Sequence, residues 1–278
     1  MARRLIVNAD DLGVNAPRSH GIFACFEHGI VTSATLICNG SDAAQAAKRA
    51  REKKLPTGIH LNLTDGEPIA DTASIASLLR PDGNFHDRAA IRRQIAEDAI
   101  DPVHVEREIR SQIEWFLDHH GPPTHVDSHH AVHTHPFIVP LLIPILQRYG
   151  VRFVRIHEEP LPPFGFVIPE ERIAALQSIS DEAAAARPHF AAEGISSTEH
   201  FRGLALSGNA SMKNLRHVLS KVPEGTTELM VHPGSMASEG APFDLDPQRQ
   251  TELMMLTDER LPTLLKELKI ELCSYEDV

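Results

Sequence analysis

The chain has 278 residues, 42% of them hydrophobic and 23% charged, a balance that supports a sizeable core and excludes an intrinsically disordered protein. Its 27 basic and 38 acidic residues leave a formal net charge of −11 with no basic cluster, which argues against binding to nucleic acid. There is no run of 18 apolar residues, no signal-peptide pattern and no paired cysteine (Cys25, Cys38 and Cys273 are isolated), so we expect a cytoplasmic protein with reduced thiols that contacts no membrane.

Short apolar runs alternate with amphipathic stretches along the chain, a pattern typical of parallel β/α proteins. The first strand is expected over residues 4–8, and a helix follows from an Asn15 cap, with Pro17 just inside it, to Gly29. The other expected strands are 31–38, 58–63, 124–127, 152–156, 203–206, 228–232 and 270–273. The other expected helices are 41–53 with Ser41 as its cap, 102–120, 136–149, 211–222, and further helices before residue 269.

Three stretches break this alternation. Residues 64–100 carry several prolines and are expected to form a long insertion, while residues 157–200 are expected to be less regular and 234–244 to be a mobile loop. About eight strands without a repeat or a linker predict a single domain over 1–278 with the fold of a TIM-like (β/α) barrel, complete or in a distorted, seven-stranded form. A doubly wound open sheet is the alternative, although no G-x-G-x-x-G follows the first strand.

Aspartate and histidine residues gather where the expected strands end, the position at which parallel β/α proteins carry their chemistry. Asp10 and Asp11 follow the first strand, His60 lies in the third between Ile59 and Leu61, and His232 ends a late strand. The end of the fourth strand carries His125, Asp127, His129, His130, His133 and His135. Each motif alone has a structural explanation, such as a helix cap, a core histidine or a solvated loop. Because four expected strands bring these residue types to the same edge of the sheet, the pattern as a whole favours a functional site.

The residue types at this rim predict a metal site. Five of the 17 histidines fall within residues 125–135, and no cysteine lies in any of the four motifs, so the donors are imidazole nitrogen and carboxylate oxygen. Two histidines and one carboxylate, with positions left for water and substrate, are typical of a catalytic Lewis-acid ion. Mg²⁺, Zn²⁺, Mn²⁺ and Co²⁺ all remain candidates on ligand type, and the histidines favour Zn²⁺ over Mg²⁺.

Seven motifs together resemble the YdjC-like family of carbohydrate deacetylases, whose best-described members are chito-oligosaccharide deacetylases. They are LIVNADDLG at 5–13, GIVTSATLICNG at 29–40, GIHLNLTDGEP at 58–68, THVDSHHAVHTHP at 124–136, VRFVRIHEEP at 151–160, ELMVHPG at 228–234 and the final ELCSYEDV. Two positions depart from the family pattern: Leu12 stands where Phe is usual, and Ala131 replaces the third histidine of a run.

The resemblance implies a TIM-like barrel, one divalent ion, described as Mg²⁺ in this family, and hydrolysis of an N-acetyl group from a sugar. By the same resemblance Asp10 is the base, and Asp11, His60 and His129 are the metal ligands.

Amide hydrolysis also needs a protonated leaving group, for which His232 is the best candidate. Arg155 either orients Asp10 through a charge-assisted hydrogen bond or is an ordinary structural ion-pair partner. His125, Asp127 and His133 are candidates for fixing the tautomers of the ligands.

The expected function is therefore a metal-dependent deacetylase, a hydrolase acting on a small N-acetylated sugar, with a homodimer as the commonest assembly for such a chain. Two alternatives remain. One is another metal-dependent TIM-barrel enzyme, such as a sugar isomerase or an amidohydrolase. The other is a sugar- or metal-binding protein without catalysis, against which Asp10 argues because a binder needs no base.

Overall fold

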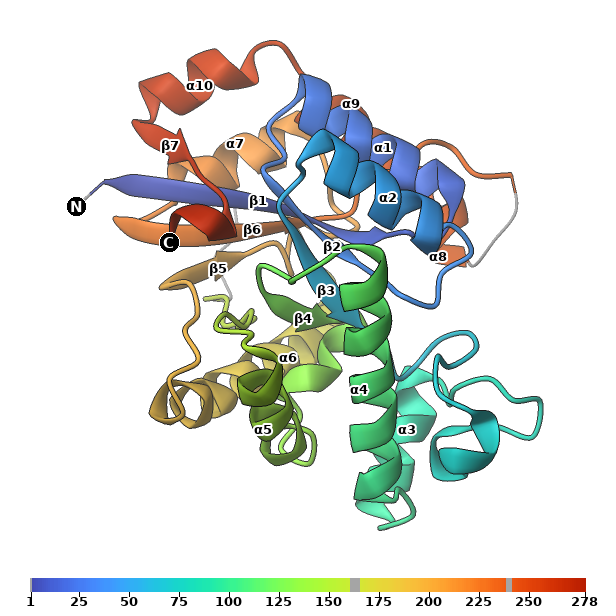
Figure 1. Ribbon diagram of the computed structural model, residues 1–278. Helices are drawn as coiled ribbons and strands as arrows, with labels where there is room; N and C mark the ends of the chain where they lie inside the picture. Colours follow the sequence, from blue (N-terminus) through green and yellow to red (C-terminus); the bar gives the residue numbers. More distant parts are fainter. Residues whose placement is uncertain (1, 161–165, 239–241) are drawn as a thin grey trace.

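Strand β1 (Arg3–Leu12) is the centre of a parallel sheet that curves into a half-barrel, in a computed structural model that describes residues 2–160, 166–238 and 242–278 (Figure 1). The other strands are β2 (Ser33–Leu36), β3 (Thr57–Leu61), β4 (Val126–Ser128), β5 (His200–Arg202), β6 (Gly225–Val231) and β7 (Ile270–Leu272). Their order is β4-β3-β2-β1-β6-β5, and every pairing is parallel. Strand β7 pairs with the first residues of β1, beyond the stretch that β2 covers.

Helices cover the sheet and connect its strands (Figure 1). They are α1 (Ala16–His28), α2 (Ala43–Lys53), α3 (Arg88–Ala96), α4 (Pro102–His119), α5 (Val139–Tyr149), α6 (Glu170–Ala192), α7 (Met212–Ser220), α8 (Pro242–Leu245), α9 (Gln248–Leu256) and α10 (Leu261–Glu267). Short 3₁₀ turns are η1 (Thr72–Ser74), η2 (Ala76–Leu78), η3 (His129–Thr134) and η4 (Tyr275–Asp277). As the sequence predicts, the Asn15 side chain caps α1 by accepting a hydrogen bond from the Arg18 amide.

Several expected elements differ from the observed ones. Residues 152–156 make only isolated bridges, at Phe153 and Val154, and not the expected strand, so the described residues form a sheet of seven strands, the smaller of the two numbers expected. The expected strand at 203–206 is a turn after β5, because Gly203 adopts a φ of 131°. The predicted Ser41 cap is also wrong: α2 begins at Ala43 behind Asp42, and Ser41 instead donates to the Val14 carbonyl.

The stretch expected to be irregular at 157–200 contains α6, the longest helix described. Its run of alanines has a high helix propensity, which offsets the loss of the one backbone hydrogen bond that Pro188 cannot donate within the helix. Apolar residues are not grouped on one clear face, and this is why the periodicity did not reveal the helix. Residues 161–165 of this stretch, and 239–241 of the expected mobile loop, lie outside the described residues.

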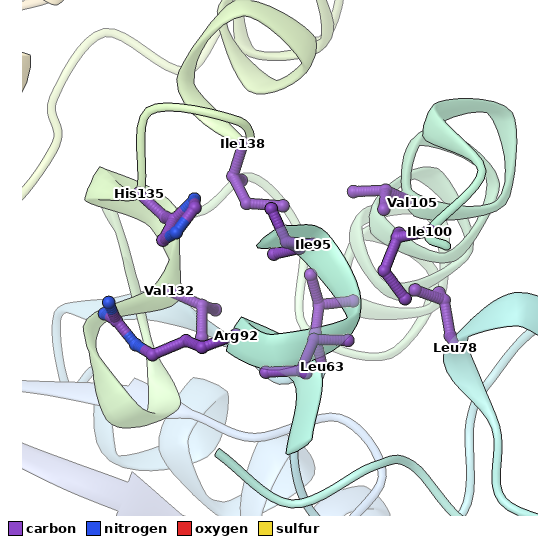
Figure 2. A pocket seen from close by; sticks show the side chains of 10 residues that line it. Leu63, Leu78, Arg92, Ile95, Ile100, Val105, Val132, His135 and Ile138 are labelled. Carbon is purple, nitrogen blue, oxygen red and sulfur yellow. The ribbon is translucent and has the colours of Figure 1, made fainter. Parts of the chain in front are cut away.

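The insertion at 64–100 is packed against the rest of the protein. Leu78, Ile95 and Ile100 face Val105 of α4 and Ile138 around a cavity of only about 10 Å³ (Figure 2). Such a volume holds one water at most, so the insertion packs closely against α4 and the segment around Ile138. Thr64, Asp65, Asp87 and Arg88 of the insertion line the cleft described below.

The inside of the half-barrel is polar while the outer face of the strands is apolar. Along β1, Leu5, Val7 and Ala9 are fully buried in the main core, and the alternating residues Asn8 and Asp10 are buried with polar partners. Polar side chains at full burial need hydrogen bonds or charge partners, so this interior is where a functional site is expected.

Candidate metal and catalytic site

A bulge in β1 brings both Asp10 and Asp11 to the site. Consecutive residues of a regular strand point to opposite faces, but the pairing register with β2 shifts between Ala9 and Leu12, and Asp11 has a φ of 67°. This left-handed conformation is uncommon outside glycine and is best tolerated by Asp and Asn. The two carboxylates therefore lie side by side, 2–3% exposed.

Asp11, His60 and His129 converge as a metal ligand set would. Asp11 Oδ1 lies 3.3 Å from His60 Nε2 and 3.3 Å from His129 Nδ1, and the three atoms lie within 4.8 Å of one another. Although both nitrogens are close, Asp11 Oδ1 is buried and has no hydrogen-bond partner among the described residues. Donors bound at about 2.0–2.2 Å to one ion are separated by such distances, so the three residues fit a divalent cation.

The other nitrogen of His60 is held by Asp127. His60 Nδ1 lies 2.7 Å from Asp127 Oδ1, and Thr35 Oγ1 donates to Asp127 Oδ2 over 3.0 Å. A proton on Nδ1 leaves the lone pair of Nε2 directed at Asp11, which is the tautomer that a metal ligand needs. Of the three residues predicted to orient ligands, Asp127 is the one that contacts a predicted ligand, His60.

The other two, His125 and His133, are buried elsewhere. His125 Nδ1 lies 2.9 Å from Thr124 Oγ1, and its ring stacks on Tyr275. His133 bridges Ser128 Oγ and the Arg155 carbonyl. Burial lowers the pKa of His125 to about 3 and of His133 to about 4, so both are neutral at pH 7. Within the described part of the chain, neither ring makes a hydrogen bond or an ion pair with Asp11, His60 or His129.

Arg155 binds Asp10 in a bidentate arrangement. Its Nη1 and Nη2 donate to Asp10 Oδ2 and Oδ1 over 2.6 and 2.7 Å, and Asn8 Nδ2 adds a bond of 2.9 Å to Oδ1. Arg155 is fully buried, and it also contacts Asp127 at 2.6 Å and Glu228 at 2.7 Å. The bidentate contact holds the plane of the Asp10 carboxylate, which is the geometry that the orienting role requires.

His232 completes the group around Asp10. Its Nε2 lies 3.8 Å from Asp10 Oδ2, and its Nδ1 has no hydrogen-bond partner among the described residues. Its backbone amide donates to Glu252 Oε2, which holds the end of β6 in place. Burial shifts the pKa of His232 well below its ordinary value, so the resting imidazole is neutral.

The carboxylates give this interior a surplus of negative charge. Burial raises the pKa of Asp10 above its usual value, and the nearby Asp127 adds to this, although Arg155 opposes it. Burial would also raise the pKa of Asp11, but His129 and His60 outweigh it and lower the pKa well below the usual value. The pKa of His60 rises to about 10 because Asp127, Asp11 and Asp10 overcome the effect of burial. The surrounding carboxylates therefore favour a positive charge near His60 Nε2. A proton supplies this charge, and a cation bound at the ligand atoms would supply it as well.

The site opens into a cleft of about 570 Å³, a volume suited to a small molecule. Asp10, Asp11, His60, His129 and His232 all line it, so the residues from four separate motifs share one cavity. An apolar part of the lining comes from Leu176 and Ile179 of α6, with Leu204 and Met230; Phe243 of α8 also lines the cleft.

Sequence reasoning missed Arg18, Glu228 and Phe243. Arg18 is buried, donates to Asp11 Oδ2 over 2.8 Å and pairs with Asp244 of α8 over 2.7 Å, and no motif marked it within α1. Glu228 carried a signal, because it lies on β6 four residues before His232, which directly follows that strand, and an even spacing along an extended chain places side chains on one face. Phe243 makes an edge contact with His232 at 5.4 Å and had no signal.

Comparisons with known proteins agree with these motifs. A model of the YdjC-like protein family matches residues 4–267. A carbohydrate deacetylase from Mus musculus is 34% identical over 99% of this chain and 94% of its own length, and one from Geobacillus stearothermophilus is 31% identical over 100% and 98%. A chitooligosaccharide deacetylase from Yersinia enterocolitica is 30% identical over 100% of both chains. Among solved structures, a suggested cellobiose-phosphate cleavage protein from Enterococcus faecalis shares the fold, with a TM-score of 0.77 at 22% identity over 100% of this chain and 99% of its own.

Proposed function

We propose that this chain, which belongs to the YdjC-like protein family, is a metal-dependent hydrolase that removes an N-acetyl group from an acetylated amino sugar or chito-oligosaccharide. The observation that carries the proposal is the convergence of Asp11, His60 and His129 beside an Asp10 carboxylate held by Arg155. The names of the deacetylase relatives, which match nearly the whole chain, support the same reaction.

The metal ligands in this proposal are Asp11 Oδ1, His60 Nε2 and His129 Nδ1. The unpartnered, buried Asp11 oxygen supports this assignment, as does the His60 tautomer that Asp127 favours. When bound, a divalent ion polarises a carbonyl and lowers the pKa of a water. Mg²⁺ is the expectation from the family and Zn²⁺ the expectation from the two imidazoles.

Asp10 is the proposed base. Its carboxylate faces the cleft, and Arg155 and Asn8 leave it little rotational freedom. Burial already raises its pKa, which strengthens it as a proton acceptor relative to an exposed aspartate. Asp10 takes the proton of the attacking water as the C–O bond to the acetyl carbon forms.

His232 is the proposed acid for the departing amine. Since burial keeps its imidazole neutral at rest, it must acquire a proton during the reaction. Asp10, at 3.8 Å, is the neighbour that holds one after it has accepted the proton of water. The proton then reaches nitrogen as the C–N bond breaks, which releases acetate and a free amine.

We also propose that residues 1–278 form a single domain, because β1 near the start of the chain pairs with β7 near its end. For the complete architecture we propose a TIM-like barrel. The isolated bridges at Phe153 and Val154 support it, because they continue the parallel pairing beyond β4. Among the described residues, no helix combines the length and apolar character that crossing a bilayer requires. We retain a cytoplasmic location and a small N-acetylated sugar substrate as part of the proposal.

The test is acetate release from N-acetylated chito-oligosaccharides by the purified protein, with and without a chelator. We expect release that the chelator abolishes and that Mg²⁺ or Zn²⁺ restores, and release that is about 10²–10⁴-fold slower from the Asp10→Asn variant. Turnover of the same sugars by isomerisation, with no acetate formed, would contradict the proposal and favour a metal-dependent isomerase. Binding of sugar without any turnover would favour a non-catalytic protein.

A further inference from the structure

We propose that Tyr275, near the end of the chain, is a positioning residue that sets the orientation of Asp10 through Glu228 and Arg155. The inference rests on the proposed function, in which Asp10 is the base. Tyr275 comes from η4, and Glu228 lies on β6. The two are 47 positions apart in sequence, and Asp10 comes from β1.

The first link is the hydroxyl of Tyr275. It donates to Glu228 Oε2 over 2.6 Å, and the two side chains are 2% and 0% exposed, so no water competes for this bond. The ring stacks on His125 with centroids 3.6 Å apart, and the side chain of Ser274 caps η4 beside it. Packing therefore holds the ring in place, and the hydroxyl alone is the group that reaches toward the site.

The second link is Glu228 to Arg155. Glu228 Oε1 accepts from Arg155 Nε over 2.7 Å and lies 2.7 Å from Nη2, while Oε2 is the oxygen bound by Tyr275. The carboxylate is thus held from both sides. Without the tyrosine donor, Oε2 becomes a buried charged oxygen with no partner. The carboxylate is then stabilised by rotating toward the guanidinium.

The third link is Arg155 to Asp10. The guanidinium faces three carboxylates, those of Asp10, Asp127 and Glu228, which compete for its donors. Its Nη1 is shared between Asp10 and Asp127, each at 2.6 Å. Because Glu228 anchors the opposite, Nε edge of the plane, any rotation of Glu228 turns the guanidinium. The turn breaks the bidentate bonds that align Asp10, and a small misalignment of a base is costly in rate.

The experiment compares Tyr275→Phe with Tyr149→Phe. The control is matched, because Tyr149 also donates its hydroxyl to a carboxylate, Glu114 at 2.5 Å, but at the surface of α5. We expect Tyr275→Phe to fold, bind metal as before and lose about tenfold in kcat with little change in KM, since the lost bond to a buried charge is transmitted only in part. Tyr149→Phe should behave as wild type. Equal kcat values for Tyr275→Phe and wild type overturn the proposal.

A second readout follows the geometry without using activity. The Nε–H of Arg155, assigned by its absence from Arg155→Lys, should exchange slowly with solvent in the wild type because Glu228 binds it in a dry interior. In Tyr275→Phe this exchange should accelerate at least about tenfold, as expected for loss of one hydrogen bond to a charge. Unchanged exchange overturns the proposal even if kcat falls. If the wild type releases no acetate, the proposed function fails while this readout still decides the positioning role.

A further pair of variants decides the case if Tyr275→Phe fails to fold. Glu228→Gln keeps an acceptor oxygen for Arg155, and Glu228→Met fills a similar volume without one. We expect Glu228→Gln to retain at least about ten times the kcat of Glu228→Met, since both remove the charge and only Met removes the hydrogen bond. Equal kcat values in these two variants overturn the proposal.

Discussion

Replacing Asp127 with asparagine tests the assignment of His60 as a metal ligand. Asp127 is fully buried, and its Oδ1 lies 2.7 Å from His60 Nδ1, while the hydroxyl of Thr35 lies farther from that nitrogen, at 3.3 Å. Asparagine has nearly the same shape, so the change removes charge and leaves the volume unaltered. The variant still offers an oxygen to Nδ1, but it no longer favours the tautomer and charge state that make Nε2 a strong donor.

The expected loss of metal affinity is in the upper half of the range of about 10- to 100-fold found for residues that orient metal ligands. That range corresponds to about 1.4–2.7 kcal/mol. We expect the upper half of this range because the His60–Asp127 pair is buried, where charge interactions are weakly screened. The substitution also removes the 2.6 Å ion pair between Asp127 and Arg155.

The measurement is a competition titration with a chromogenic chelator, using Zn²⁺ and separately Mn²⁺. Thr35→Val is the control: it removes the 3.0 Å hydrogen bond to Asp127 Oδ2 and the longer contacts of the same hydroxyl with Asn8 and His60, but it leaves the His60–Asp127 bond. We expect at most a few-fold change in metal affinity. Full metal affinity in Asp127→Asn would refute the view that this carboxylate tunes a ligand. Equal losses in the two variants would point instead to a general effect of disturbing the polar interior.

Four further predictions concern the reaction and its metal. Asp10→Asn should keep the metal and lose about 10²–10⁴-fold in kcat, the range for a positioned base, and an active variant would move the base elsewhere. His232→Ala should lose about 10²-fold or more on an N-acetylated sugar but much less on an aryl acetate, whose phenolate leaves unprotonated; equal losses would remove the acid role. Phe243→Ala should raise KM about 2- to 10-fold with kcat little changed, because the ring is an exposed apolar surface of the cleft; an unchanged KM would exclude its contact with substrate. Saturating metal should raise the thermal midpoint of the wild type and not that of Asp11→Asn, and equal shifts would place the ion elsewhere.

The position of the site was predictable because parallel strands present their carboxyl ends at one rim. Five residues that the sequence places in or directly after expected strands all line one cleft: Asp10, Asp11, His60, His129 and His232. The bulge that turns Asp11 toward the site could not be predicted from the sequence, since two aspartates after a strand are also typical of a helix cap. Arg18 could not be found either, because its partners lie on β1 and α8, and only the fold brings these elements together.

The fold was predictable where local patterns and burial agree. Helix α4 has an Asp101 cap, Pro102 in its first turn and a buried stripe that includes Ile109, Ile113 and Phe116, and its predicted and observed bounds nearly coincide. In α6 these signals are missing, since Pro169 at its cap position makes no side-chain bond and small alanines provide most of its packing surface. The bounds of β4 were shifted by one or two residues, and the strand expected at 203–206 does not overlap β5, because three-residue strands are specified by their neighbours.

The polar interior of the half-barrel is hard to explain by stability. Burying Asp10, Asp127 and Glu228 around one guanidinium costs desolvation energy, and apolar residues of similar volume would satisfy the same space at least as well. Asp11 Oδ1 is also buried with no hydrogen bond from any residue that the structure describes, and Asp11 has a left-handed backbone conformation. Unfavourable features of this kind persist when they serve a reaction. The bulge, the shared guanidinium and the unpartnered oxygen all meet at Asp10 and Asp11, so the features that oppose folding mark the same two residues that the strand-end pattern selected.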